Sequence, residues 1–281
     1  RGGEASASAP VAGDTTVSAG RLSDREWIAR NYLTTPDDAA RLGYRIDWQH
    51  QGDPGTAITE VQAFGPSVFA IDDLMRISRY DGRTGTRLWR VPMLENVSRT
   101  QGMVYLPADD ALFVGTGSEF HVYDGGTGVL VDRQKLDRAA NTAPTPAGRF
   151  LMYGSRDGLV VWHAFQVGAA WRSYRIAESI AVAPAISEGF LVAAGNGGTV
   201  SCLRLGNASR VWTRRALADI VAAPAAGNGM AYVASLDQHL RAWPLAFERP
   251  TPAWEYLAKA PLSDSPTIVG DSVYQQVPGH G

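Results

Sequence analysis

Acidic pairs are the first residues in this chain whose types could support chemistry. Asp72-Asp73 and Asp109-Asp110 each place two carboxylates side by side, and carboxylate oxygens are ligands that calcium prefers. A calcium site needs about six or more oxygen ligands, and no segment around either pair supplies them. Both pairs lie between apolar runs, where aspartate commonly forms turns. We therefore expect turn residues here and assign no metal ligand.

The histidines and the single cysteine offer no catalytic arrangement. The histidines are His50, His121, His163, His239 and His280. None has a ligand spacing such as His-x-x-x-His, and the sequence contains no Gly-x-x-x-x-Gly-Lys phosphate loop or Gly-x-Ser-x-Gly nucleophile turn. Cys202 lies in the run Val200-Ser-Cys-Leu203 and cannot form an internal disulfide. We expect it to be a small buried hydrophobic side chain.

Five of the eight tryptophans recur along the chain at a nearly fixed step. They are Trp48, Trp89, Trp171, Trp212 and Trp254, at intervals of 41, 82, 41 and 42 residues. A step near 41 residues, with one copy missing near Val131, is typical of an array of repeated units. Each copy holds short β-branched and aromatic runs separated by Gly, Asp and Asn, which predicts strands. Prolines 144, 184, 224 and 266 recur at a similar step ahead of each later copy.

Each repeat predicts a blade, meaning a four-stranded antiparallel sheet. The proline-containing stretch would open the innermost strand, and the tryptophan would lie on the outermost strand. Asp157-Gly158 and Asn196-Gly197 suit tight hairpins between the second and third strands. Because a blade cannot bury both faces alone, blades stack around an axis, and the large indole fills the wedge between neighbours. The predicted fold class is an all-β protein, a β-propeller with short N-terminal helices.

One sequence motif carries a resemblance to a known family. Tyr80-Asp-Gly-Arg-Thr-Gly-Thr-Arg-Leu-Trp89 resembles the Asp-x-x-Thr-Gly-x-x-x-Trp repeat of quinoprotein-like (PQQ-like) β-propellers. Tyr123-Asp-Gly-Gly-Thr-Gly128 matches the first half of that repeat, whereas Leu205-Gly-Asn-Ala-Ser-Arg-Val-Trp212 keeps only the tryptophan. The resemblance covers residues 42–281. Its two ends, 40–48 and 271–281, resemble a subfamily common in planctomycete bacteria, which implies a fold and no particular activity.

The resemblance also raises the hypothesis of a quinone-dependent dehydrogenase. Such enzymes hold the quinone beside a catalytic aspartate and a calcium bound by Glu and Asn, often beneath a disulfide between adjacent cysteines. This chain has no adjacent cysteines, and we place none of those ligands at matching motif positions. The resemblance therefore favours the non-catalytic, BamB-type branch of outer-membrane assembly lipoproteins, although their lipid-bearing N-terminal cysteine is absent here. We assign no cofactor and no catalytic residue.

Our interpretation is a non-catalytic propeller scaffold or structural subunit of a cell-envelope assembly, periplasmic or associated with the outer membrane, that binds other protein subunits. Two alternatives stay open: a PQQ-dependent or other small-ligand enzyme that uses the central channel, and a propeller that binds glycans or peptides.

A net charge of −2 and a pI near 6.2 argue against a nucleic-acid partner. No apolar run approaches the roughly 18–20 residues of a transmembrane helix.

The N-terminal 41 residues differ in composition from the repeats. Residues 1–20 are mostly Gly, Ala, Ser, Thr and Val, which predicts a flexible leader or tether; we expect it to extend across another subunit. Residues 21–41 predict a helical adaptor, with a second helix starting at Thr35-Pro36. A first helix is predicted over residues 22–33. The candidate partner-binding residues, Trp27, Ile28 and Tyr32, lie on one side of it. Because the numbering starts at Arg1, we expect a removed leader peptide.

Residues 42–281 make up the predicted propeller. We expect five full blades over residues 56–255 and two strands of a sixth over residues 264–277. Residues 44–50, around Trp48, are predicted to be the outer strand of the last blade, supplied from the N-terminal side to close the ring and remove an exposed edge. The resembled family usually has seven or eight blades, so we expect a longer protein that continues beyond the C-terminal end of this chain.

Overall fold

The computed structural model describes residues 35–50, 52–53, 55–93, 97, 99–176, 179–248 and 250–279. The chain divides between Gln49 and His50 into two compact units. In the first unit, helix α2 (Pro36–Arg41) starts where the sequence predicts, and its N-cap Thr35 accepts a hydrogen bond from the Asp38 N–H. A proline in the first turn and an acidic first turn favour this start. The predicted leader lies outside the described residues.

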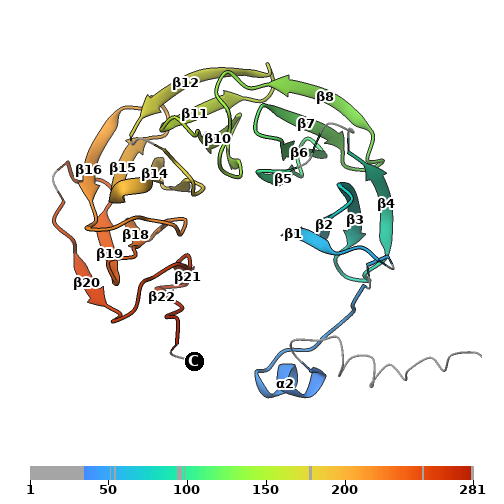
Figure 1. Cartoon of the computed structure of the whole chain (residues 1–281), viewed down its shortest axis with the longest axis horizontal. Helices are drawn as coiled ribbons and strands as arrows, with labels where there is room; N and C mark the ends of the chain where they lie inside the picture. The colour runs from blue at the N-terminus through green and yellow to red at the C-terminus, as the bar shows by residue number, and fades with distance from the viewer. Residues whose placement is uncertain are drawn as a thin grey trace, which may run out of the picture. The chain divides into compact units, whose positions relative to one another are not determined.

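The described residues of the second unit form five four-stranded antiparallel sheets and one two-stranded sheet, in which each strand pairs with its sequence neighbours. The sheets follow one another in an arc in chain order, with β4, β8, β12, β16 and β20 on the outside (Figure 1). The strands are β1 (Ile58–Phe64), β2 (Ser67–Asp72), β3 (Arg76–Asp81), β4 (Arg87–Pro92), β5 (Gly102–Leu106), β6 (Ala111–Gly115), β7 (Glu119–Asp124), β8 (Leu130–Lys135), β9 (Thr145–Ala147), β10 (Phe150–Gly154), β11 (Leu159–Ala164), β12 (Ala169–Arg175), β13 (Ala185–Ser187), β14 (Phe190–Ala194), β15 (Thr199–Arg204), β16 (Arg210–Arg215), β17 (Ala225–Gly227), β18 (Met230–Ala234), β19 (His239–Pro244), β20 (Trp254–Leu257), β21 (Thr267–Val269) and β22 (Ser272–Tyr274). The predicted all-β propeller fold is confirmed.

Local turn chemistry follows the predicted pattern. The recurring prolines come directly before β9, β13, β17 and β21, the first strands of their sheets. Gly158, between β10 and β11, has a φ of 82°, and Gly197, in the short 3-10 turn Asn196–Gly198, has a φ of 77°. Both values lie in the left-handed region, which glycine adopts without steric cost. These glycines therefore let the chain reverse between the second and third strands.

The hydrophobic core lies between successive sheets. The second and third strands of the four-stranded sheets are mostly buried on both faces, as their apolar runs predict. Between the second and third sheets, for example, the rings of Phe113 and Phe165 lie 5.5 Å apart and those of Phe120 and Tyr153 lie 5.7 Å apart. These edge-on aromatic contacts add to the burial of apolar area. Stacking of sheets therefore provides the core that no single sheet could form.

A hydrogen bond also joins each four-stranded sheet to the next one. The acceptor is a main-chain carbonyl at the end of the third strand of the following sheet or in the turn that follows this strand. The bonds run from Trp89 Nε1 to Gly125 O (2.6 Å), from Gln134 Nε2 to Phe165 O (2.8 Å) and from Trp162 Nε1 to Leu205 O (3.0 Å). Trp212 Nε1 donates to both Pro244 O (3.0 Å) and Leu245 O (3.3 Å). We call these bonds the inter-sheet hydrogen bonds. They fix each sheet against its neighbour near the rim.

The equivalence of the five tryptophans is only partly correct. Trp89, Trp212 and Trp254 pair with corresponding residues of their third strands, namely Arg79, Cys202 and Ala242. In the third sheet, however, Trp162 pairs with Arg172, and Trp171 is the unpaired residue of a β-bulge. Trp162 already fills the space between the sheets, so Trp171 does not take the place that its spacing predicts.

The predicted closing strand is wrong. Residues 44–50 are described, and they contain no strand. In the described part of the chain the last sheet consists of β21 and β22, and no third strand offers the edge that the segment was predicted to join. A strand needs such a partner, because its main-chain donors and acceptors must otherwise bond to water. Trp48 therefore does not lie on a strand, unlike Trp89 and Trp212.

Candidate functional site

The predicted partner-binding residues, Trp27, Ile28 and Tyr32, lie outside the described residues. The structure therefore brings none of them to a site. The acidic pairs, Cys202 and the histidines other than His280 lie among the described residues.

Asp73, Asp109 and Asp110 are turn residues, as predicted, whereas Asp72 is the last residue of strand β2. Asp72 Oδ1 accepts hydrogen bonds from the main-chain N–H groups of Leu74 (3.1 Å) and Arg76 (2.9 Å). Asp110 has a φ of 43° and accepts a hydrogen bond from the Tyr105 hydroxyl at 2.6 Å. Over the part of the chain that the structure describes, no group of three or more His, Cys, Asp or Glu residues is arranged to hold a metal ion.

Cys202 is a buried strand residue, as predicted. It lies in β15 in the core between the fourth and fifth sheets. Burial raises the pKa of its thiol to about 12. Because the thiolate is the nucleophilic form, this thiol is protonated at neutral pH and is not poised to react.

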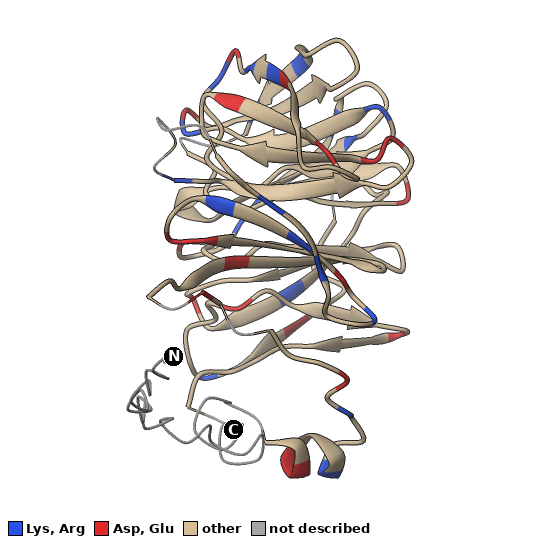
Figure 2. Cartoon of the chain, turned by 90° about the vertical axis from the view of Figure 1, so that its right-hand side faces the viewer, with Lys and Arg blue, Asp and Glu red and all other residues tan. Residues whose placement is uncertain are grey.

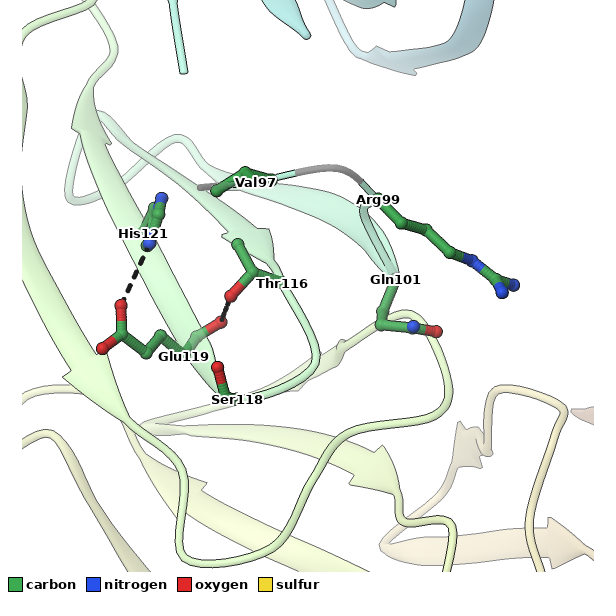
Figure 3. Close-up of a pocket in the computed structure, with 7 residues that line it drawn as sticks. All are labelled: Val97, Arg99, Gln101, Thr116, Ser118, Glu119 and His121. Atoms are coloured by element: carbon green, nitrogen blue, oxygen red, sulfur yellow. Dashed lines mark hydrogen bonds and ion pairs between the residues drawn. The ribbon is translucent and has the colours of Figure 1, made fainter. Parts of the chain in front are cut away.

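A polar pocket of about 190 Å³ lies between the segment that leads into β5 and the hairpin that joins β6 to β7 (Figure 3). It is lined by Val97, Arg99, Gln101, Thr116, Ser118, Glu119 and His121. The arrangement arises because the Gln101 N–H donates to the Gly115 carbonyl at 2.7 Å, which holds residues 99–101 against the hairpin. Within the hairpin, Thr116 Oγ1 donates to the Glu119 carbonyl at 3.0 Å. Gln101, Thr116 and Ser118 give the pocket neutral polar side chains, and Val97 is its one aliphatic side chain. The pocket therefore suits a small polar ligand or water.

Glu119 is the electrostatic centre of this pocket. Its carboxylate lies 2.7 Å from Arg133 Nη2 and 3.1 Å from His121 Nε2. The Arg133 guanidinium, followed by His121, holds the pKa of Glu119 below its ordinary value. His121 is 1% exposed, and its Nδ1 has no hydrogen-bond partner among the described residues. These partners favour the ionised form of the Glu119 carboxylate.

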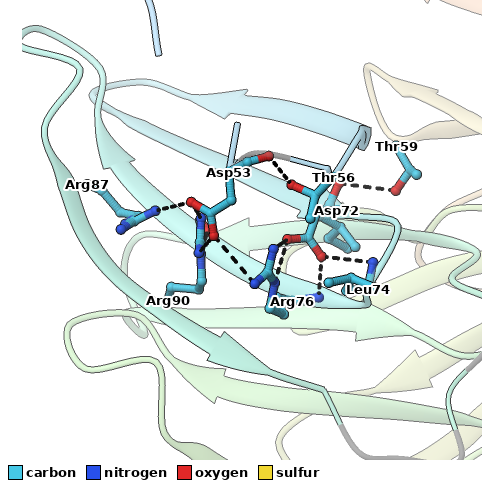
Figure 4. A network of polar contacts seen from close by, with 10 residues as sticks. Asp53, Thr56, Thr59, Asp72, Leu74, Arg76, Arg87 and Arg90 are labelled. Carbon is cyan, nitrogen blue, oxygen red and sulfur yellow. Dashed lines mark hydrogen bonds and ion pairs between the residues drawn. The ribbon is translucent and has the colours of Figure 1, made fainter. Parts of the chain in front are cut away.

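A second polar cluster lies on the face of the first sheet that points away from the second sheet (Figure 4). Asp53 forms ion pairs with Arg90, with Arg76 at 3.4 Å and with Arg87 at 3.6 Å, and Asp72 binds Arg76 at 2.7 Å. The Arg90 hydrogen bond is the main cause that lowers the pKa of Asp53 to about 2. Sequence reasoning missed this Asp53–arginine cluster, because its partners are far apart along the chain and no local motif marks them.

Charged residues of both signs lie on the side of the sheets drawn in Figure 2. Figure 2 shows acidic and basic residues interspersed over this side of the sheets. In the described residues, no helix is long and apolar enough to cross a membrane.

The repeat pattern and the sheets agree with a comparison against protein families. Residues 75–164 and 151–280 match the family described as outer membrane protein assembly factor BamB. The chain belongs to this family. The predicted relation to BamB-type, PQQ-like propellers is thereby confirmed. No curated protein matches the sequence.

Solved structures share the fold with this BamB-family chain. BamB from Moraxella catarrhalis has a TM-score of 0.60 and 16% identity, over 77% of this chain and 68% of that one. The computationally designed Ika8 protein has a TM-score of 0.63 and 16% identity, over 78% and 67% of the two chains. A chain of the mitotic checkpoint complex has a TM-score of 0.64 and 13% identity, over 80% and 75%. These likenesses show the fold alone, because the same propeller hosts unrelated functions.

Proposed function

We propose that this chain is a non-catalytic propeller scaffold that binds protein partners within a cell-envelope assembly, in the periplasm or at the outer membrane. The observation that carries the proposal is the match of residues 75–280 to the family of outer membrane protein assembly factors. The geometry supports it, because the inter-sheet hydrogen bonds hold successive sheets in a fixed relation. A fixed array of sheets can present its turns and outer strands to several partners at once.

The first test is the native size of the protein in its own envelope. The chain, tagged at its C-terminal end and expressed at its natural level, is extracted with mild detergent and cross-linked before purification. We expect stoichiometric protein partners, identified by mass spectrometry, and a particle larger than the 30.1 kDa chain. A protein that remains a monomer in the extract, without cross-linked partners, would contradict the scaffold.

A second measurement distinguishes the scaffold from a quinone enzyme. The purified protein is incubated with PQQ and calcium and assayed for dye reduction with alcohols and sugars. We expect no activity above that of a boiled sample. Turnover that depends on both PQQ and calcium would support the enzymatic alternative instead.

The N-terminal segment provides a third test of the scaffold. We propose that residues 1–20 extend across another subunit and that Trp27, Ile28 and Tyr32 contact a partner. Limited proteolysis should cut this segment in the purified chain and spare it in the extracted assembly. The double substitution Trp27→Ala and Tyr32→Ala should reduce the amount of partner recovered, whereas Asp37→Ala, nearby on helix α2, should not. Equal proteolysis in both samples would count against a bound leader.

A further inference from the structure

The β-bulge in the third sheet places an indole on the molecular surface. Trp171 is the unpaired residue between the pairs His163–Ala170 and Trp162–Arg172. A bulge redirects the side chain of its extra residue, and Trp171 is 41% exposed. The space between the third and fourth sheets is already filled by Trp162, which is fully buried. Trp171 is therefore not needed for the joint between the sheets.

The surroundings of Trp171 form a shaped surface. Its ring stacks on Phe150, with centroids 5.1 Å apart and an angle of 29° between the planes. The Arg149 guanidinium lies 5.0 Å from the Phe150 ring, and that of Arg172 lies 4.8 Å from the Trp171 ring. A hollow of about 410 Å³ opens beside these rings between the β9–β10 and β11–β12 turns. We call Arg149, Phe150, Val167 and Trp171 the aromatic ledge.

The ledge carries a positive charge that the described residues do not balance. None of its lining residues is acidic. Arg149 touches the Phe150 ring, and no hydrogen bond or ion pair links its guanidinium to another described residue. Arg172 is different, because its Nη1 donates to the Asn207 carbonyl at 2.7 Å. Arg149 is therefore the guanidinium that remains available for a carboxylate, whose planar geometry it matches.

Apolar side chains occupy the same bulge position on the two preceding sheets. Leu88 on β4 and Val131 on β8 are the unpaired residues there, and they are 53% and 61% exposed. The strands β4, β8 and β12 follow one another along the outside of the arc (Figure 1). The exposed apolar bulge position is thus shared by β4, β8 and β12, whereas Val211 at this position on β16 is buried. A row of exposed apolar side chains on three strands suits an extended chain better than a single small molecule.

We infer that the aromatic ledge docks an acidic segment of a protein partner, with a proline or aromatic ring stacked on Trp171 and a carboxylate paired with Arg149. The inference rests on the proposed scaffold function and names the chemistry of one partner segment. A neutral sugar fits less well, because Gln166 is the one neutral polar side chain in the lining. A cationic or aliphatic segment would leave Arg149 without a counter-charge.

The direct test is peptide binding to the full chain. The probe is a fluorescein-labelled peptide, Asp-Glu-Pro-Trp-Glu-Asp, followed by fluorescence anisotropy. We expect saturable binding that Trp171→Ala and Arg149→Glu each weaken by about tenfold or more, as anchor residues do. Two altered peptides, one with Lys in place of each acidic residue and one with Ala in place of Pro and Trp, should bind the native chain as weakly as the original peptide binds the two variants.

Two matched controls accompany the variants. Trp254→Ala removes an outer-strand tryptophan that is also 41% exposed, and Arg156→Glu reverses a charge at the opposite end of the third sheet. Both should bind the peptide like the native chain. Absence of saturable binding, or equal losses in the ledge and control variants, would overturn the inference. Preferential binding of a neutral oligosaccharide or of anionic lipid vesicles, sensitive to Trp171→Ala, would also overturn it.

A cross-linking experiment separates this inference from the scaffold itself. A photoreactive amino acid at Val167, on the ledge, is compared with one at Arg156 in the native envelope. Capture of an acidic partner segment at residue 167 alone supports the ledge. If partners co-purify but none is captured at residue 167, the scaffold stands and the ledge is wrong. If no partner co-purifies at all, the scaffold fails. Because Arg149→Glu changes an exposed side chain, it keeps the test open even if Trp171→Ala folds poorly.

Discussion

The indole N–H of Trp162 donates a hydrogen bond to the main-chain carbonyl of Leu205 in the next sheet, at 3.0 Å. Leu205 follows Trp162 by 43 residues, about one repeat. Because the ring is fully buried, the bond is formed away from water, where an unpaired carbonyl is costly. This contact joins the third and fourth sheets and makes the stability of one sheet depend on its neighbour.

We predict that Trp162→Phe lowers the free energy of unfolding by about 1–3 kcal/mol, because it removes a buried donor and leaves the Leu205 carbonyl without its partner. Chemical denaturation followed by circular dichroism measures the change. The matched control is Trp171→Phe, for which we expect a change within about 0.5 kcal/mol, since that indole lies on the surface. Equal losses in the two variants would contradict a structural role specific to Trp162.

A pH dependence follows from His163. Its Nε2 bonds to Gln134 Oε1 at 2.8 Å, and burial lowers the pKa of the imidazole from its ordinary value of 6.5. Below pH 6.5 the unfolded chain therefore takes up a proton that the folded chain resists, so the free energy of unfolding falls as pH drops through this window toward the folded pKa. We expect His163→Gln to flatten this fall between about pH 7 and pH 5. Denaturation curves at several pH values would show the same slope in both proteins if the idea is wrong.

The Asp53–arginine cluster should make the first sheet sensitive to salt. Asp53 is held by Arg90 and lies 3.4 Å from Arg76. We expect Asp53→Asn to lower the melting temperature at low ionic strength, and the difference to shrink as added salt screens the pairs. Asp73→Asn, which changes an exposed neighbour of Asp72, is the control and should have little effect. A melting temperature of the Asp53 variant that matches the native protein at low salt would contradict the prediction.

The same carboxylate predicts a loss of stability in acid. The pKa of Asp53 is lowered from 3.8 to about 2, so the folded chain keeps the charge where the unfolded chain becomes protonated. The contribution of Asp53 is complete above pH 3.8 and is lost as pH falls through about 2. Unfolding curves between these pH values should therefore differ in slope between the native protein and Asp53→Asn.

The close approach of the third sheet to the loop before β13 predicts a strict requirement at Gly154. A Cβ at this position would lie 2.8 Å from Ile180 Cβ and 3.0 Å from Thr142 Cγ2. We expect Gly154→Ala to cost about 1–3 kcal/mol of stability, because the neighbours must shift to relieve the overlap. Gly206→Ala, where no atom lies within 4 Å of the new Cβ, should cost far less. A loss of similar size at both glycines would show that crowding is not the cause.

The repeat could be read from the sequence because its signals are local. Prolines, Gly-containing turns and short apolar runs each act within a few residues, and all of them mark the strands correctly. The role of Trp171 could not be read in the same way. Its spacing fits the repeat, yet the strand register decides which side chain enters the joint. Arg172 pairs with Trp162 as Trp89 pairs with Arg79, so Trp171 lies one residue before the paired position, on the β-bulge. In the third sheet, the indole on the neighbouring strand, Trp162, fills the space instead.

The polar sites were harder to predict for a different reason. Glu119 and Arg133 lie on paired strands, and Asp53 reaches Arg90 37 residues away. Such pairs form only once the sheets have folded, so no motif announces them. The acidic pairs and Cys202 were predictable, because a turn or an apolar strand decides their surroundings locally.

The inter-sheet hydrogen bonds are accepted by main-chain carbonyls, those of Gly125, Phe165, Leu205 and Pro244. This choice of acceptor has an evolutionary consequence. A carbonyl is present whatever side chain its residue carries, so the receiving sheet can change its sequence there without breaking the joint. The donor can change as well: Trp89, Gln134 and Trp162 serve the same purpose from different strands. Repeats joined in this way can drift apart one at a time, without compensating changes in their neighbours. That freedom is consistent with a shared fold at 16% identity or less.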